Sequence, residues 1–252
     1  MNLKYITCSD PRESVDIKDV IKLLNLSPKV EIGMQSHPSA MIYGMNRNIW
    51  FNKFLAWAEL QTVPVNVAMH VNYQWCDALC SGKIPTEIAR WMDMRNKKTD
   101  TPLIKRWQLN IGDGTRNFDP DKVAKLIERF PENDFILPYN DTVSTKIQSL
   151  YQTRAKFSLL YDSSYGYGIC PDKWNVPVYN DIPMGYAGGL SADNVSGNLD
   201  KIAKVVPCDY TTWIDAEGRM MQPGTRTWDM ANVYSYVKNA LEWELKSQQK
   251  TK

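Results

Sequence analysis

Residues that can exchange protons or bind polar ligands follow eight short, β-rich runs along this chain of 252 residues. Cysteine, histidine and carboxylate side chains can act as general acids or bases when their surroundings tune their pKa. Asparagine and glutamine add hydrogen bonds, and glycine allows close approach to the backbone. In chain order, the set is Cys8; Gln35, Ser36 and His37; His70 and Asn72; Gln108, Asn110 and Asp113; Asn140 and Asp141; Asp162; Gly188 and Gly189; and Asp215, Glu217 and Gly218.

Two glycine-bearing turns could bind an anion. Residues 188–191 read Gly-Gly-Leu-Ser and precede an expected helix, and residues 217–219 read Glu-Gly-Arg. Backbone N–H groups at a helix N-terminus attract phosphate. The same glycines could instead serve only to make tight turns. The spacing favours a phosphate site formed by Gly188, Gly189, Leu190, Ser191, Gly218 and Arg219.

The β-rich runs predict strands that must position these residues. Few runs alternate between apolar and polar residues, as expected of parallel strands buried on both faces. The predicted strands cover residues 4–8, 30–34, 63–71, 107–111, 134–139, 157–161, 182–187 and 211–214.

Helical patterns lie between most of these strands. The first is expected to begin after Ser14, and the fourth to be capped by Asp119. Residues 163–180 are rich in Gly, Tyr and Pro and predict a loop, and residues 246–252 predict a flexible tail. The predicted helices cover residues 15–25, 48–60, 85–94, 120–130, 141–152, 192–205 and 230–245.

Eight strands alternating with about seven helices predict a single (β/α)8 barrel, a TIM barrel, over residues 1–252. An open, doubly wound sheet is the alternative, but no Gly-x-Gly-x-x-Gly motif follows the first strand. In a closed barrel the carboxyl ends of the strands meet at one mouth, where active sites lie. The polar residues would then converge there, which indicates an enzyme.

Four segments carry a further set of motifs. Residues 4–8 read Lys-Tyr-Ile-Thr-Cys, residues 107–110 read Trp-Gln-Leu-Asn, and residues 159–163 read Leu-Leu-Tyr-Asp-Ser. Residues 187–195 contain Ala-Gly-Gly-Leu followed by Asn-Val. In content and order, these segments resemble strands one, four, six and seven of the phosphoribosylanthranilate isomerase family.

The resemblance implies an activity and two roles. That family is a single barrel that converts a phosphoribosyl amine to a ketose by an Amadori rearrangement, and it implies no cofactor. By resemblance, Cys8 would be the general base and Asp162 the general acid. The acid protonates the ring oxygen, and the base removes the proton from C2 of the imine. Taken alone, Cys8 could equally be a packed core thiol, and Asp162 a carboxylate that braces a loop.

The chain departs from the family where the aromatic substrate would bind. The family has an arginine shortly after the second strand, whereas residues 36–40 contain none and the next arginine is Arg47. The family histidine after the fourth strand is Asn110 here. The resemblance therefore supports a sugar-phosphate ligand for this chain better than it supports the anthranilate part of the family's substrate.

The eighth strand end also differs, because Asp215 and Glu217 add two carboxylates near the presumed phosphate. They would repel a dianion unless Arg219 or Arg226 compensates. The alternative is thus a barrel that binds a phosphorylated or nucleotide-like small molecule without converting it. The aromatic side chains around the sixth loop could stack on a planar ligand or could pack within the protein; they are Tyr161, Tyr165, Tyr167 and Trp174.

Composition sets the expected partners and compartment. With 30 Lys and Arg against 28 Asp and Glu, the net charge is +2, which does not indicate nucleic-acid binding. No apolar run approaches the roughly 18 residues typical of a membrane span. Five cysteines without a secretory signal favour free thiols in the cytoplasm. We expect a small phosphorylated ligand and a monomer or homodimer.

No metal site is predicted. His37 and His70, together with the strand-end carboxylates, lack the spacing of a known metal motif. Cys76 and Cys80 lie four residues apart without a second Cys or His pair, so two packed thiols are expected if the segment is helical.

Overall fold

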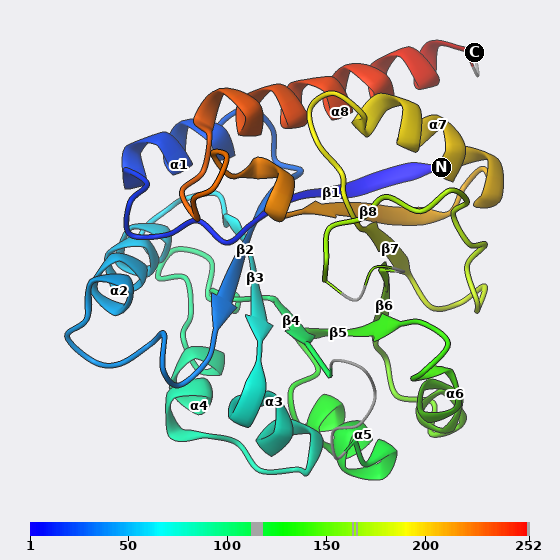
Figure 1. The fold of residues 1–252 in the computed structure, drawn as a ribbon. Coiled ribbons are helices and arrows are strands. Elements are labelled where there is room, and N and C mark those ends of the chain that lie inside the picture. Colours follow the sequence, from blue (N-terminus) through cyan, green and yellow to red (C-terminus); the bar gives the residue numbers. More distant parts are fainter. Residues whose placement is uncertain (112–117, 163, 165, 251–252) are drawn as a thin grey trace. The chain divides into compact units, whose positions relative to one another are not determined.

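The computed structural model describes residues 1–111, 118–162, 164 and 166–250 (Figure 1). Asp113, one of the predicted strand-end residues, lies outside the described residues. The strands follow one another in chain order and close into a parallel barrel, which confirms the predicted (β/α)8 fold. They are β1 (Asn2–Ser9), β2 (Val30–Ser36), β3 (Asn66–Val71), β4 (Arg106–Leu109), β5 (Asp134–Tyr139), β6 (Ser158–Asp162), β7 (Met184–Ala187) and β8 (Thr211–Ala216).

Helices alternate with these strands, except that the described residues between β6 and β7 contain none, as predicted. A short 3-10 helix, η1 (Gly218–Met220), follows β8. The α-helices are α1 (Ile17–Leu24), α2 (Asn46–Ala58), α3 (Tyr73–Cys80), α4 (Thr86–Met92), α5 (Pro120–Arg129), α6 (Ser144–Gln152), α7 (Val195–Val205) and α8 (Met230–Lys250).

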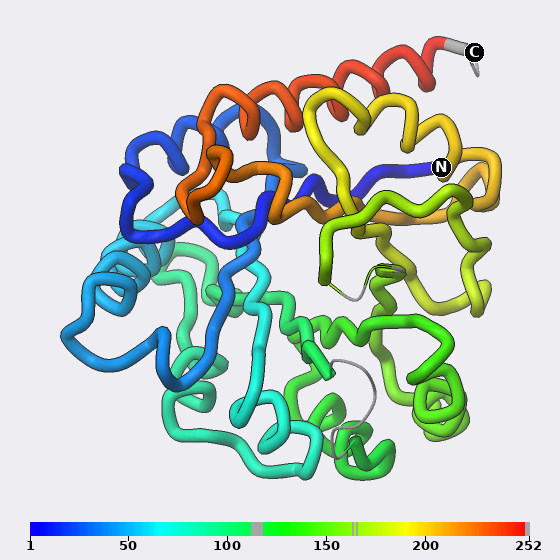
Figure 2. The backbone as a smooth tube through the Cα atoms, in the orientation of Figure 1, coloured from blue at the N-terminus to red at the C-terminus, as the bar shows by residue number. Residues whose placement is uncertain are grey.

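The chain divides into two compact units. The terminal unit comprises Met1–Glu31 and Tyr161–Lys252, and the central unit comprises Ile32–Leu160. Within the terminal unit, β1 pairs with β8, and α8 packs on β1 and α7 (Figure 1, Figure 2). No helix among the described residues is both long enough and apolar enough to cross a lipid bilayer.

Helix ends follow local capping chemistry. The Asp119 carboxylate accepts a hydrogen bond from Lys122 N at 3.2 Å, which confirms the predicted N-cap of α5. The cap of α1 is Asp16, which accepts from Lys18 N at 2.9 Å, so the helix begins two residues later than the predicted start at residue 15. The helix begins later because the Asp16 carboxylate can accept a hydrogen bond from one of the free N–H groups of the first turn.

Two helical segments differ from the prediction. The sequence patterns gave no helix at α3, yet Cys76 and Cys80 lie on one buried face of it with their sulfurs 3.9 Å apart. They are packed thiols that form no disulfide, as expected for a helical segment. Helix α8 continues to Lys250, five residues beyond the predicted end, because its last residues are polar but favour helix.

Gly185 shows how the terminal unit accommodates a large side chain. A Cβ atom at this position of β7 would lie 2.1 Å from Cε2 of Trp213 in β8. The Trp213 indole therefore covers Gly185, and the two residues lie on the same face of the sheet. A side chain at Gly185 would force the indole out of the core.

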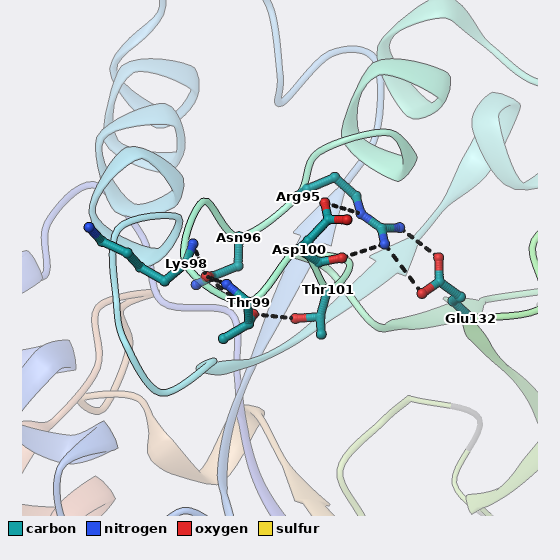
Figure 3. A network of polar contacts seen from close by, with 7 residues as sticks. All are labelled: Arg95, Asn96, Lys98, Thr99, Asp100, Thr101 and Glu132. Atoms are coloured by element: carbon teal, nitrogen blue, oxygen red, sulfur yellow. Dashed lines mark hydrogen bonds and ion pairs between the residues drawn. The ribbon is translucent and has the colours of Figure 1, made fainter.

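A polar network in the central unit fixes the loop between α4 and β4 (Figure 3). Arg95 binds both carboxylate oxygens of Glu132, at 2.6 and 3.3 Å. The buried Asn96 accepts from the backbone N–H groups of Lys98 and Thr99 and donates to two carbonyl groups at the end of α2. The loop precedes β4, at the amino end of the strand, where conserved structure in this fold usually serves stability.

Candidate ligand-binding site

Five polar side chains at the carboxyl ends of β2, β3 and β4 form one hydrogen-bonded chain, here called the amide network. Gln108 Nε2 donates to Asn110 Oδ1 at 2.8 Å, and Asn110 Nδ2 donates to Asn72 Oδ1 at 2.9 Å. Asn72 Nδ2 donates to Gln35 Oε1 at 2.6 Å. The Gln35 Nε2 atom lies 3.5 Å from His70 Nδ1 and completes the network.

The register of the parallel strands brings these residues to one level. His70 and Gln108 are direct partners across β3 and β4. Asn72 N donates to Ser36 O at 2.9 Å, and Asn110 N donates to Val71 O at 3.0 Å, so the pairing continues past the strand ends. His70 and Gln108 are buried, whereas the other three members are half-buried. The network therefore presents neutral donors and acceptors at the strand ends.

Arg47 brings a positive charge to the amide network. This residue belongs to α2, and its Nη2 donates to the Gln35 carbonyl at 3.0 Å although the side chain is only 8% exposed. The sequence patterns left the second strand end without a guanidinium, because Arg47 lies eleven residues beyond Ser36. The β2–α2 loop folds back, so that the Arg47 guanidinium lies beside the carboxyl end of β2.

His37 is held within its own loop. Its Nδ1 lies 2.9 Å from Ser39 Oγ and accepts a hydrogen bond from Ala40 N at 3.2 Å. The ring packs edge-on against Tyr73, with centroids 5.2 Å apart. His37 was predicted to line the mouth, and its described contacts give it a structural role in the β2–α2 loop.

In the terminal unit, Cys8 faces away from the neighbouring polar residues. Thr7 Oγ1 donates to Glu31 Oε1 at 2.7 Å, and Ser9 Oγ donates to Asp215 Oδ1 at 2.6 Å. Because successive side chains of a strand point to opposite faces, Cys8 points to the face opposite Thr7 and Ser9.

The surroundings of Cys8 favour a neutral thiol. The residue is fully buried, and burial, followed by the nearby charges of Asp215 and Glu31, raises the pKa of its thiol. Tyr236 of α8 is also fully buried, and burial, followed by Cys8 and Asp215, raises the pKa of its hydroxyl. The predicted role of Cys8 as a general base stays a prediction, and it requires the thiolate that this environment disfavours.

Asp162 at the end of β6 braces the loop that follows. Its Oδ1 accepts from Ser164 N at 2.9 Å and from Ser164 Oγ at 2.7 Å, and its Oδ2 accepts from Gly166 N at 2.9 Å. A Cβ atom on Gly188 would lie 3.2 Å from Oδ1. The structure thus brings the predicted acid beside the predicted phosphate turn, with both carboxylate oxygens already accepting hydrogen bonds.

The turn after β7 is covered by the chain itself. Gly189 has φ of +62°, and a Cβ there would lie 2.5 Å from Cys170 N and 2.8 Å from Gly168 O. Ser191 N, one of the expected phosphate donors, instead donates to Asn194 Oδ1 at 2.9 Å. The close approach that glycine permits is therefore made by residues 168–170, and phosphate binding by Gly188, Gly189, Leu190 and Ser191 stays a prediction that requires this loop to move.

Asn198 of α7 anchors the covering loop. Its Oδ1 accepts from Trp174 Nε1 at 3.1 Å and lies 3.3 Å from the Cys170 sulfur. Trp174 packs edge-on against Tyr161 and Tyr186, with centroids 6.2 and 5.6 Å apart. Of the two possibilities left open for these aromatic residues, the structure supports packing within the protein for Tyr161 and Trp174. Tyr167 is exposed, and Tyr165 lies outside the described residues.

The end of β8 is more open. Asp215 is buried against Ser9, Glu217 is half-buried, and Gly218 and Arg219 are exposed. A Cβ on Gly218 would meet no atom within 4 Å. Arg219 forms no ion pair with any residue that the structure describes. Its guanidinium is therefore free to meet an anion from solvent.

Neither a protein-family model nor a curated protein matches this chain. The resemblance to phosphoribosylanthranilate isomerase therefore rests on the sequence motifs alone. It remains a hypothesis about function, whereas the barrel fold is shown by the structure.

Sequence reasoning missed the buried carboxylates of Asp10, Glu31 and Glu244, and it gave no metal motif. Glu31, inside β2, is fully buried and paired with Thr7, and the only available signal was a charged residue within an apolar run. Over the described ranges, no group of three or more His, Cys, Asp and Glu side chains is arranged to hold a metal ion.

Proposed function

We propose that this protein binds a small sugar phosphate at the amide network, without a rearrangement that depends on Cys8. The amide network itself is the observation that carries the proposal. Carboxamides both donate and accept, as the vicinal hydroxyl groups of a sugar do, so a chain of them can exchange its internal hydrogen bonds for bonds to a ligand.

Arg47 supports the phosphate part of this proposal. A guanidinium is the side chain best suited to bind a phosphate through two parallel hydrogen bonds. Its contact with the Gln35 carbonyl keeps the charge close to the amide network. We therefore expect ribose 5-phosphate to bind more tightly than ribose.

The test is calorimetric titration of ribose 5-phosphate and ribose into the wild type and Asn72→Ala. Loss of the central amide should weaken binding by roughly tenfold, since it removes at least one hydrogen bond and disconnects the network. Asn133→Ala is the matched control, because its amide donates to Ile104 O at 2.9 Å at the other end of the strands. This control should lose stability but keep its affinity.

The absence of binding by the wild type would overturn the proposal. Equal weakening in Asn72→Ala and Asn133→Ala would also contradict it, because the effect would then come from general destabilisation.

The isomerase reaction is the second candidate, favoured by the position of Asp162 beside Gly188. In this case the purified wild type should convert a phosphoribosyl amine to its ketose. Asp162→Asn and Cys8→Ser should each lose about 10²–10⁴ in rate, because an amide cannot donate the required proton and a hydroxyl is a poor base. Binding of ribose 5-phosphate together with failure to convert the amine would favour the first candidate.

A further inference from the structure

The central unit contains a cavity of about 300 Å³ that the proposed sugar-phosphate site does not use. It is lined by the β2–α2 loop and by α2, α3 and α4. Its volume lies at the lower end of the range for small-molecule sites, roughly 300–1,000 Å³. The cavity can therefore hold one small metabolite.

One wall of the cavity is apolar and rigid. Trp75 of α3 and Trp91 of α4 pack edge-on, with centroids 5.5 Å apart and an interplanar angle of 81°. The Phe51 ring of α2 also packs edge-on against Trp91, with centroids 5.3 Å apart. Met41 from the loop also lines the cavity. These residues are buried and offer aromatic and thioether surface to an apolar group.

Two opposite charges line the same cavity. Glu87 and Arg90 lie three residues apart on α4, and both are exposed. Neither forms an ion pair with another described residue, although the spacing allows them to pair with each other. Arg90 makes one long hydrogen bond, 3.5 Å, to Asn52 Oδ1. One anionic and one cationic group are therefore available to a ligand.

Asn48 and Asn52 of α2 add oriented amides to the cavity lining. Asn52 Nδ2 donates to the Asn48 carbonyl at 2.9 Å and to Asn48 Oδ1 at 3.0 Å. Asn48 Nδ2 in turn donates to Met41 O at 3.4 Å, which ties the loop to the helix. These bonds fix two polar side chains of the cavity lining.

We propose that this cavity binds a free amino acid with a large apolar side chain. The ligand's ammonium group would meet Glu87, its carboxylate would meet Arg90, and its side chain would pack against Trp75 and Trp91. A simple organic anion would leave Glu87 unmatched, and a simple cation would leave Arg90 unmatched. A residue inside a peptide has neither terminal charge, so the charge pattern favours the free zwitterion.

The test uses three compounds that share one side chain and differ in their terminal charges: L-phenylalanine, N-acetyl-L-phenylalanine and L-phenylalanine amide. Calorimetry should detect binding of phenylalanine to the wild type. The acetylated compound, which lacks the ammonium group, and the amide, which lacks the carboxylate, should bind roughly tenfold more weakly or worse. Equal binding of the three compounds would overturn the proposal, as would no binding of phenylalanine.

Charge-removing variants then assign the two ends of the ligand. Glu87→Gln should lose affinity for phenylalanine but not for the acetylated compound, and Arg90→Gln should lose affinity for phenylalanine but not for the amide. Both side chains are exposed, so these changes should leave the fold intact. Glu128→Gln and Arg129→Gln, an exposed pair on α5, are the matched controls and should bind phenylalanine normally. Unchanged binding in Glu87→Gln and Arg90→Gln would contradict the assignment.

Discussion

Gly189 occupies a backbone conformation and a space that only glycine fits. Its φ of +62° is costly for other residues, and residues 168–170 fill the place of a Cβ atom. Sequence spacing indicated that this glycine admits a phosphate. The structure instead explains the glycine by packing within the chain.

Gly189→Ala should therefore lower the free energy of unfolding by at least about 1 kcal/mol, from the strained φ and the clash with Cys170 N. The affinity of the folded variant for ribose 5-phosphate should not change. Denaturant unfolding measured beside a binding titration separates the two effects. A variant with wild-type stability and weakened binding would instead support the phosphate turn predicted from the sequence.

Because of Cys8, the free energy of unfolding should depend on pH in the alkaline range. Its pKa in the folded chain is raised above the ordinary value of 9.0 by burial and by Asp215 and Glu31. Above about pH 9, the unfolded chain releases this proton while the folded chain keeps it, so the free energy of unfolding falls. Below that pH, this contribution is constant.

Cys8→Ala should remove part of this slope, up to about 1.4 kcal/mol per pH unit for one group. Urea unfolding of both proteins between pH 8 and pH 10, on the order of one unit either side of the ordinary thiol pKa, measures the difference. Cys208→Ala is the control, because Cys208 is exposed. A wild-type slope identical to that of Cys8→Ala would contradict the buried neutral thiol.

The direction of individual side chains was the least predictable feature. The sequence placed Cys8, His37 and Asp162 near strand ends, but a shift of one residue in a strand moves a side chain to the opposite face. Cys8 and Ser9 are adjacent, yet only Ser9 bonds Asp215. The members of the amide network could be predicted from the sequence, because each is a polar residue at a strand end. Which of them bond to each other could not be predicted, because that depends on the register between neighbouring strands.

At the scale of elements, the α4–β4 loop contains both a buried polar residue, Asn96, and a more exposed one, Arg95 (Figure 3). The two make it possible to compare what buried and exposed polar contacts contribute to stability. Asn96 is 1% exposed and bonds both the loop backbone and the end of α2. Asn96→Ala should cost about 1–3 kcal/mol, because it leaves buried backbone groups without partners. Arg95→Ala removes an exposed ion pair with Glu132 and should lower the free energy of unfolding much less, because water screens both charges.

Thermal and urea unfolding of the two variants test this difference. The ion-pair variant should also approach the wild type as salt is added, since exposed pairs are screened. A larger loss in Arg95→Ala than in Asn96→Ala would contradict the roles assigned to the loop.

Helix α3 was not predicted from the sequence, and its composition explains why. Tyr, Trp, Cys and Asp, which make up much of Tyr73–Cys80, are weak helix formers. The helix is stabilised by packing against other parts of the chain, as where Trp75 lies edge-on to Trp91 of α4. Such tertiary contacts have no local sequence signal. By contrast, the clear apolar face and Asp119 cap of α5 made that helix predictable to within one residue.

At the scale of the whole molecule, the order and number of strands followed from the sequence because buried parallel strands give short, β-rich runs between helical patterns. The barrel closure was expected from that count and is present. What the barrel binds depends on a few polar side chains, and those carry no comparable periodic signal.

A crystal structure of the protein soaked with ribose 5-phosphate tests the central claim most directly. We expect the sugar hydroxyl groups within hydrogen-bond distance of Gln35, Asn72 and Asn110, and the phosphate at Arg47. A ligand whose ring lies against Asp162 and Cys8, with the amide network unchanged, would contradict the account and favour the isomerase reaction.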